Sequence, residues 1–251
     1  MIRLIILAIF LVIYLIVSLP FMLVELIIQQ FNMNLRSVIC LKWVQFGFWI
    51  VMKISGVKTE VKGLENIPDD TSVLFASNHK SYFDIVTTYQ YMKRPTGYIA
   101  KAEMKKIPLL SWIMYFVNCL FLDRENPRKG LKTIQKGTDY LQNGVSMFIC
   151  PEGTRSKTNE MLPFKEGSLK MAIKAKKPIV PVGIINSAAI FEEHFPKIKP
   201  GTVKIIFGKP IETKDLSRPE QRELTSHVQE CVAKLLDPED EMYRRIIQYG
   251  N

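Results

Sequence analysis

An uncharged apolar run near the N-terminus limits what this chain can fold into more than any other feature. Residues 4–24 carry no charge, and these 21 residues extend about 31 Å as a helix. That length crosses the hydrocarbon core of a bilayer, which is about 30 Å thick. A secretory signal would have a shorter apolar core and a small-residue cleavage site, whereas here the apolar character continues into ELIIQQF. We therefore expect an uncleaved membrane element.

A second apolar segment, WVQFGFWIVM, follows at residues 43–52 between Lys42 and Lys53. Its ten residues extend only about 15 Å as a helix, which is too short to cross a bilayer. Aromatic side chains bounded by lysines are typical of the membrane interface, although a core helix covering the rest of the protein has a similar composition. The alternatives are one true span or a helix pair lying in one leaflet. Pro20 disturbs a straight span and favours the pair, so we assign residues 1–56 to a membrane-anchoring helix pair.

The chain changes character after residue 56. Short apolar runs then alternate with stretches of helical length, which predicts an α/β domain over residues 57–251 with helices flanking a mixed sheet. The predicted strands are residues 73–76, 98–100, 120–122, 146–150, 179–185 and 203–207. The predicted helices are residues 85–92, 109–116, 128–142, 168–176 and 219–236.

The charge balance favours anionic partners. Lysine and arginine number 34 against 24 aspartates and glutamates, a net charge of +10, which suits nucleic acid, anionic lipid head groups or phosphorylated substrates. The apolar N-terminus argues against nucleic acid as the partner. Four cysteines and three histidines are scattered without metal-ligand spacing, so we expect no metal site and reduced cysteines in a cytosol-facing protein.

The stretch SNHKSYFDI places His79 five residues before Asp84. Five residues of helix rotate by about 500°, so the two side chains cannot share a face of one straight helix. They can meet if His79 lies in a loop after a strand and Asp84 lies in the first helical turn. The alternative is that Ser81 and Asp84 form a capping box at the helix start and that His79 is incidental.

Polar side chains follow three of the predicted strands, where sites on α/β sheets gather. Asn78 and His79 follow the first, Arg124 follows the third, and the turn at residues 152–155 follows the fourth. Together they offer a base, a carboxylate, a hydroxyl, a glycine and two guanidinium groups, and guanidinium forks suit phosphate.

These motifs resemble those of the glycerolipid acyltransferases, in particular the bacterial 1-acyl-sn-glycerol-3-phosphate acyltransferases. The resemblance covers residues 71–185 and rests on four blocks in the family's order. They are the histidine–aspartate block at Asn78, His79 and Asp84, the aromatic–basic block at Phe121 and Arg124, the Glu-Gly-Thr-Arg block at residues 152–155, and the proline block at Pro181. Cys150 departs from the pattern, because relatives often carry an aromatic residue there. The fold implied is an α/β domain preceded by a membrane-associated helix pair.

The resemblance implies that His79 and Asp84 are catalytic. Imidazole is well matched to removing a proton from a hydroxyl at neutral pH. Asp84 would hold the correct tautomer of His79 and stabilise the imidazolium, with the substrate hydroxyl in place of an enzyme serine. The implied substrate-binding residues are Arg124 and Arg155 for the acceptor phosphate, Lys101 as a third candidate, Glu152 to orient the glycerol or an arginine, and Gly153 and Thr154 to shape the turn and polarise the carbonyl.

The implied reaction moves a fatty acyl group from a thioester to the sn-2 hydroxyl of lysophosphatidic acid (1-acyl-glycerol-3-phosphate) and gives phosphatidic acid. Acyl-CoA or acyl carrier protein would be the co-substrate, with no further cofactor. The partner would be the cell membrane, with the catalytic domain facing the cytoplasm. Two alternatives are an acyltransferase acting on glycerol-3-phosphate or another lysophospholipid, and a non-catalytic lipid-binding protein at the membrane surface.

Overall fold

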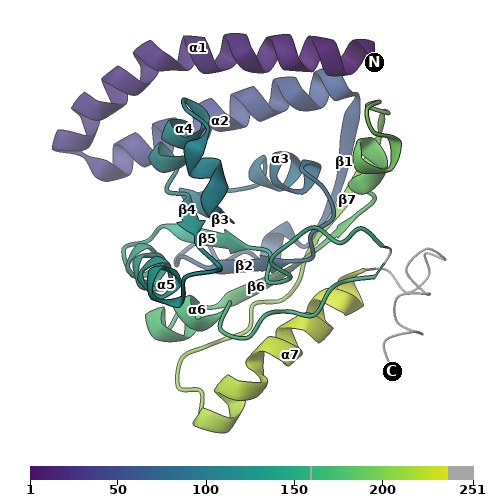
Figure 1. Ribbon diagram of the computed structural model, residues 1–251. Helices are drawn as coiled ribbons and strands as arrows, with labels where there is room; N and C mark the ends of the chain where they lie inside the picture. Colours follow the sequence, from purple (N-terminus) through teal and green to yellow (C-terminus); the bar gives the residue numbers. More distant parts are fainter. Residues whose placement is uncertain (159, 237–251) are drawn as a thin grey trace.

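A seven-stranded sheet organises the computed structural model, which describes residues 1–158 and 160–236 (Figure 1). The spatial order of the strands is β1-β7-β6-β2-β5-β3-β4. Neighbouring strands are parallel except β6 and β7, so the sheet is mixed. The strands are β1 (Val57–Lys62), β2 (Leu74–Ser77), β3 (Thr96–Lys101), β4 (Leu120–Leu122), β5 (Ser146–Ile149), β6 (Ile179–Ile185) and β7 (Gly201–Phe207).

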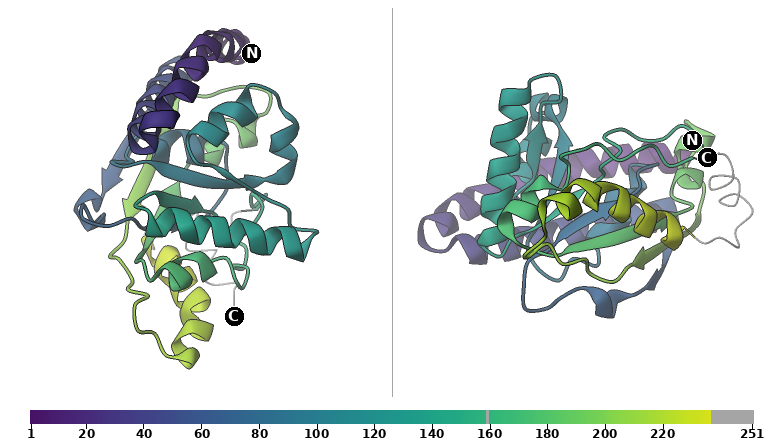
Figure 2. Two further views of the ribbon diagram at one scale, coloured as in Figure 1. Left: turned by 90° about the vertical axis from the view of Figure 1, so that its left-hand side faces the viewer. Right: turned by 90° about the horizontal axis from the view of Figure 1, so that it is seen from below.

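Helices cover both faces of this sheet. Figure 2 shows α1 and α2 side by side beyond one face and α7 beneath the other. The helices are α1 (Ile2–Phe31), α2 (Met33–Ser55), α3 (Phe83–Tyr89), α4 (Leu110–Phe116), α5 (Pro127–Gln142), α6 (Lys170–Ala175) and α7 (Arg218–Leu235). Short 3-10 helices are η1 (Leu64–Asn66), η2 (Ala102–Lys106), η3 (Ala188–Ile190) and η4 (Glu192–His194).

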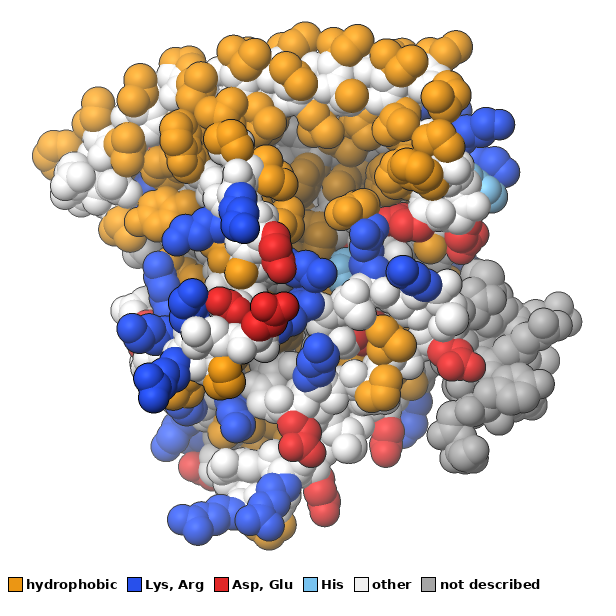
Figure 3. All heavy atoms as spheres, viewed as in Figure 1, with side chains coloured by type: hydrophobic (Ala, Val, Ile, Leu, Met, Phe, Trp, Pro, Cys, Tyr) orange, Lys and Arg blue, Asp and Glu red, His pale blue; other side chains and the backbone are white. Residues whose placement is uncertain are grey.

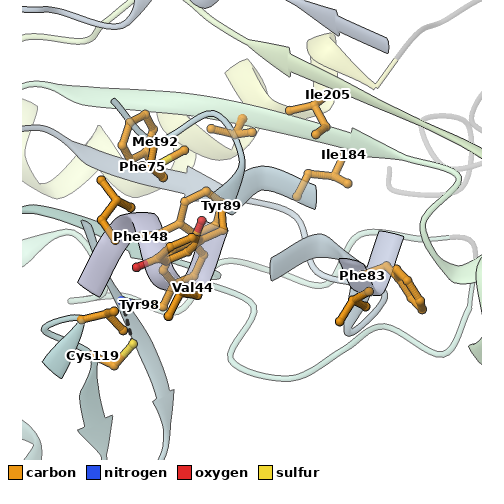
Figure 4. Packing of buried hydrophobic residues seen from close by; sticks show 14 of the residues in the cluster. Val44, Phe75, Phe83, Tyr89, Met92, Tyr98, Cys119, Phe148, Ile184 and Ile205 are labelled. Carbon is orange, nitrogen blue, oxygen red and sulfur yellow. Dashed lines mark hydrogen bonds between the residues drawn. The ribbon is translucent and has the colours of Figure 1, made fainter. Parts of the chain in front are cut away.

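Alternation along the strands divides the core into two layers. In β2, Phe75 contributes to the cluster beneath α2 and α3, whereas Leu74 and Ala76 contribute to the cluster on the opposite face. Phe75 stacks on Phe148 of β5, and Figure 4 shows these rings packed beside Tyr98. Because successive strand residues point to opposite faces, one buried strand supplies both layers.

The first two helices form an antiparallel hairpin. Asn32 separates them and caps α2, since its side chain accepts a hydrogen bond from the Leu35 amide at 2.9 Å. Pro20 lies inside α1 without ending it, and α2 is 23 residues long, so the second segment extends well beyond the ten residues predicted at 43–52. Both helices are long and apolar enough to cross a membrane by length and composition, and hydrophobic side chains cover this side of the molecule (Figure 3). These features suggest membrane association.

The hairpin packs against the rest of the protein. Val44 and Val51 of α2 belong to the same hydrophobic cluster as Phe75. Arg36, which is 2% exposed, donates a hydrogen bond to the Asn118 side chain at 3.1 Å. The helix pair at residues 1–56 therefore shares a core with the α/β domain.

The predicted fold class is confirmed, and each predicted strand and helix overlaps an observed one. The boundary at residue 56 stays a prediction, and the end of the predicted domain, residues 237–251, lies outside the described residues. Strand β1 was missed. It lies at an edge of the sheet, pairs with β7 alone among the described strands, and alternates buried or partly buried positions with exposed ones. Its charged residues therefore broke up the apolar run expected of a buried strand.

Candidate active site

The three predicted loops meet at one edge of the sheet. Strands β2, β5 and β4 belong to its parallel part, and the carboxyl ends of parallel strands lie at the same edge. The loop after β2 carries His79, the loop after β5 carries residues 152–155, and the loop after β4 carries Arg124. The Asn78 side chain bridges to β6, since it exchanges two 2.8 Å hydrogen bonds with the backbone of Ile184.

His79 and Asp84 form a hydrogen-bonded pair. The distance from His79 Nδ1 to Asp84 Oδ2 is 2.8 Å, and the Asp84 side chain is fully buried while that of His79 is 20% exposed. A histidine whose Nδ1–H donates to a carboxylate keeps its Nε2 lone pair free to accept a proton. The pair therefore has the arrangement of a general base and its orienting carboxylate.

The capping alternative is also partly realised. Asp84 Oδ2 accepts hydrogen bonds from the backbone amides of Lys80 at 2.8 Å and Ser81 at 2.9 Å. Ser81 Oγ, however, accepts from the Phe83 amide at 2.9 Å instead of from Asp84. Asp84 thus contacts the start of α3 and the imidazole with the same oxygen, so capping by Asp84 is compatible with its pairing with His79.

The surroundings of His79 shift its pKa. Burial lowers the pKa of His79, whereas the Cys150 sulfur and the Asp84 carboxylate beside it raise the pKa, and the net shift is upward. Cys150 follows β5, and its sulfur also lies 3.4 Å from Ser77 Oγ. The residue that departs from the family pattern is therefore a direct neighbour of the imidazole.

Glu152 ties loops together. Its Oε1 accepts from the His79 amide at 2.6 Å and its Oε2 from the Leu162 amide at 2.8 Å. Burial raises the pKa of Glu152 to about 7, against the lowering effect of these two hydrogen bonds. We expected this side chain to orient the acceptor glycerol or an arginine, but both oxygens face backbone amides. Gly153 beside it has a φ of +77°, a conformation that favours glycine.

Arg155 lies against the start of α3. Its guanidinium carbon is 3.8 Å from the centroid of the Tyr82 ring, and its Nη1 donates to Glu192 Oε1 at 2.9 Å. The Arg155 side chain is 34% exposed, so it is both oriented and accessible. Glu192 belongs to η4, outside every motif found in the sequence.

The remaining predicted site residues lie along the same edge. Arg124 is exposed after β4. Partial desolvation lowers its pKa, and this effect outweighs the raising effects of Glu103 and Cys150. Lys101 is exposed at the end of β3, and Thr154 is exposed in its turn. Strands lie about 4.8 Å apart, so β4, three positions from β2, starts about 14 Å from the strand that leads to His79. Arg155 follows β5, two strand positions from β4, and the Cys150 sulfur before its turn is close enough to raise the pKa of Arg124.

Two residues at this edge were not assigned a site role from the sequence. The sequence singles out Cys150 only as a departure from the family pattern, and its place directly after β5 was the available signal. Glu192 gave no signal, because it is 37 residues from Arg155 and 111 residues from Ser81. Only the folded chain brings these residues together.

Comparison with known proteins agrees with this architecture. The sequence model of the family described as Acyltransferase matches residues 58–185. A chloroplastic 1-acyl-sn-glycerol-3-phosphate acyltransferase from Brassica napus is 30% identical over 206 residues, which are 81% of this chain and 57% of the relative. The 1-acyl-sn-glycerol-3-phosphate acyltransferase of Saccharomyces cerevisiae is 32% identical over 193 residues, 75% of this chain and 63% of the relative.

A solved structure is similar along almost its whole length. The crystal structure of the 1-acyl-sn-glycerophosphate acyltransferase PlsC from Thermotoga maritima has a TM-score of 0.76 and 26% identity, over 96% of this chain and 97% of that chain. The chain spans somewhat more than half of the length of the plant and yeast relatives. It belongs to the Acyltransferase family.

Proposed function

We propose that the protein transfers a fatty acyl group from an acyl thioester to the sn-2 hydroxyl of 1-acyl-glycerol-3-phosphate, which gives phosphatidic acid. The observation that carries this proposal is the 2.8 Å His79–Asp84 pair at the sheet edge that also presents Arg155. The names of the similar plant, yeast and Thermotoga proteins support the choice of acceptor.

The chemistry is a direct transfer. The acceptor hydroxyl attacks the thioester carbonyl while His79 Nε2 takes its proton, so a C–O bond forms as the carbonyl oxygen becomes negative. The C–S bond then breaks, and the proton passes from His79 to the leaving thiolate. Asp84 Oδ2 stabilises the imidazolium between these steps. No covalent acyl-enzyme is needed, and no cofactor beyond the thioester.

Arg155 supplies recognition of the acceptor phosphate, with Arg124 and Lys101 further along the edge. A guanidinium presents five N–H donors in a planar fork that matches phosphate. The acceptor is a membrane lipid, so the hydrophobic α1 and α2 would hold the site at the bilayer surface. The α/β domain would lie on the cytoplasmic side of the cell membrane, where acyl-CoA and acyl carrier protein are found.

The test is an assay of the purified protein with lysophosphatidic acid, glycerol-3-phosphate or another lysophospholipid, each with acyl-CoA and with acyl carrier protein as donor. Lysophosphatidic acid should be the preferred acceptor. His79→Ala should lower turnover by about 10²- to 10⁴-fold, the usual contribution of general-base catalysis. His227→Ala removes an exposed histidine on α7 and is the matched control. Wild-type turnover in His79→Ala would refute the mechanism, and a protein that binds lysophosphatidic acid without consuming thioester would be a lipid-binding protein.

A further inference from the structure

Glu192 is bound by three donors from two segments of the active site. Its Oε1 accepts from Arg155 Nη1 and from the Tyr82 amide, both at 2.9 Å, and its Oε2 accepts from Ser81 Oγ at 2.6 Å. Ser81 Oγ in turn accepts from the Phe83 amide, which fixes the hydroxyl. The Glu192 side chain is 21% exposed. One carboxylate therefore links η4, the arginine turn and the start of α3.

These contacts complete a pattern in the turn that carries the imidazole. Four consecutive backbone amides, those of residues 79–82, each donate to a carboxylate oxygen. Glu152 accepts the first, Asp84 the second and third, and Glu192 the fourth. Removing Glu192 would release the end of this turn and the side chain of Arg155 together.

We infer that Glu192 is a positioning residue, which holds Arg155 ready for the acceptor phosphate and locks the turn from His79 to Tyr82. Its kinetic consequences rest on the proposed function. Glu192 lies outside the matched family segment, residues 58–185. It acts through Arg155 and does not itself take part in the reaction.

The geometry distinguishes positioning from competition with phosphate. Glu192 accepts from Nη1 of the Arg155 fork, and the guanidinium carbon lies 3.8 Å from the centroid of the Tyr82 ring. The other guanidinium N–H groups make no hydrogen bond within the described part of the chain and remain available to a ligand. Glu192 is also held by Ser81 and Tyr82. An incoming anion could therefore displace Glu192 from Arg155 only if these two further hydrogen bonds also broke.

The test compares Glu192→Ala and Glu192→Gln with Glu193→Ala. Glu193 is an exposed neighbour in η4 with the same charge; it lies near the Lys80 side chain but makes no hydrogen bond to Arg155, Ser81 or Tyr82 among the described residues, so its removal controls for loss of charge beside the turn. Glu192→Ala should raise the KM for lysophosphatidic acid about 10-fold, the lower end for losing a hydrogen bond to a charged group, because the contact is partly exposed. The donor KM should stay unchanged. Glu192→Gln, which keeps one acceptor oxygen, should be intermediate, and Glu193→Ala should resemble wild type.

Two further measurements separate positioning from a general loss of structure. Arg155→Ala should cost much less acceptor affinity in the Glu192→Ala background than in wild type, since the two residues act as a unit. Hydrogen exchange of the Tyr82 amide should be faster in Glu192→Ala and unchanged in Glu193→Ala.

An unchanged acceptor KM, a lower acceptor KM, or fully additive effects of the two substitutions would each overturn the inference. If wild-type protein does not acylate lysophosphatidic acid, the proposed function fails. Hydrogen exchange then tests by itself whether Glu192 holds the turn. An unaltered exchange rate of the Tyr82 amide in Glu192→Ala would overturn the inference.

Discussion

Asp84→Asn isolates the electrostatic part of the proposed mechanism. Asparagine has nearly the same shape as aspartate, and its oxygen can take the place of Asp84 Oδ2, which accepts three hydrogen bonds of 2.8–2.9 Å. Its amide nitrogen would then replace Oδ1, which is buried without a hydrogen-bond partner among the described residues. The substitution removes the charge beside His79 while the imidazole keeps its orientation.

The magnitude follows from the imidazolium that forms during the reaction. With charge centres about 4 Å apart and an effective dielectric constant near 20, the attraction lost is about 4 kcal/mol. At 1.36 kcal/mol per tenfold, the rate should fall about 10³-fold. The free energy of unfolding should change by less than this, because weakening three hydrogen bonds by ~1 kcal/mol each is offset in part by removing a buried charge. We expect a folded protein with little activity.

The assay is kcat/KM for lysophosphatidic acid across pH, together with thermal unfolding. General-base catalysis needs neutral His79, so wild-type activity should rise with pH through a pKa above the ordinary 6.5. Loss of the Asp84 charge should lower that pKa and move the rising limb to lower pH. Asp69→Asn, at an aspartate with a 76% exposed side chain, is the matched control. Unchanged activity of Asp84→Asn, or an unchanged pKa for the rise of kcat/KM with pH, would refute the role of Asp84.

Three further predictions concern recognition, loop structure and membrane binding. Arg155→Ala should weaken use of lysophosphatidic acid about 10- to 150-fold but barely affect monoacylglycerol, and Arg155→Lys should restore only part of the preference; an unaltered preference would move the phosphate site elsewhere. Glu152→Gln should lose one of two backbone hydrogen bonds and lower the melting temperature together with activity, and an unchanged melting temperature would contradict the tying role. A truncated protein that begins at Val57 should leave membranes more easily and lose activity on vesicles, and full activity on vesicles would show that α1 and α2 are dispensable.

The position of the site residues at one edge of the sheet was predictable, because it depends on residues that are neighbours in the sequence. Each strand that carries a site residue is a short apolar run followed by a polar turn, and parallel pairing brings those turns together. The same reasoning allowed the His79–Asp84 contact, since one residue lies in the loop and the other in the first turn of α3, and the family resemblance favoured it. The length of α2 was not predictable in this way, because its first half is mixed in polarity and the helix is stabilised by packing on α1 and α3.

The contacts of the carboxylates could not be read from the sequence, because each depends on a backbone amide brought close by tertiary structure. Glu152 faces the amides of His79 and Leu162, and Glu192 faces that of Tyr82. This arrangement also bears on how a site proposed to bind an anionic acceptor can retain three carboxylates. Five of their six oxygens accept hydrogen bonds from backbone amides, the imidazole, the Ser81 hydroxyl or Arg155, and these donors offset much of the carboxylate charge. Under the proposed function, the partly exposed Arg155 and the exposed Arg124 would be the groups that an approaching phosphate meets first.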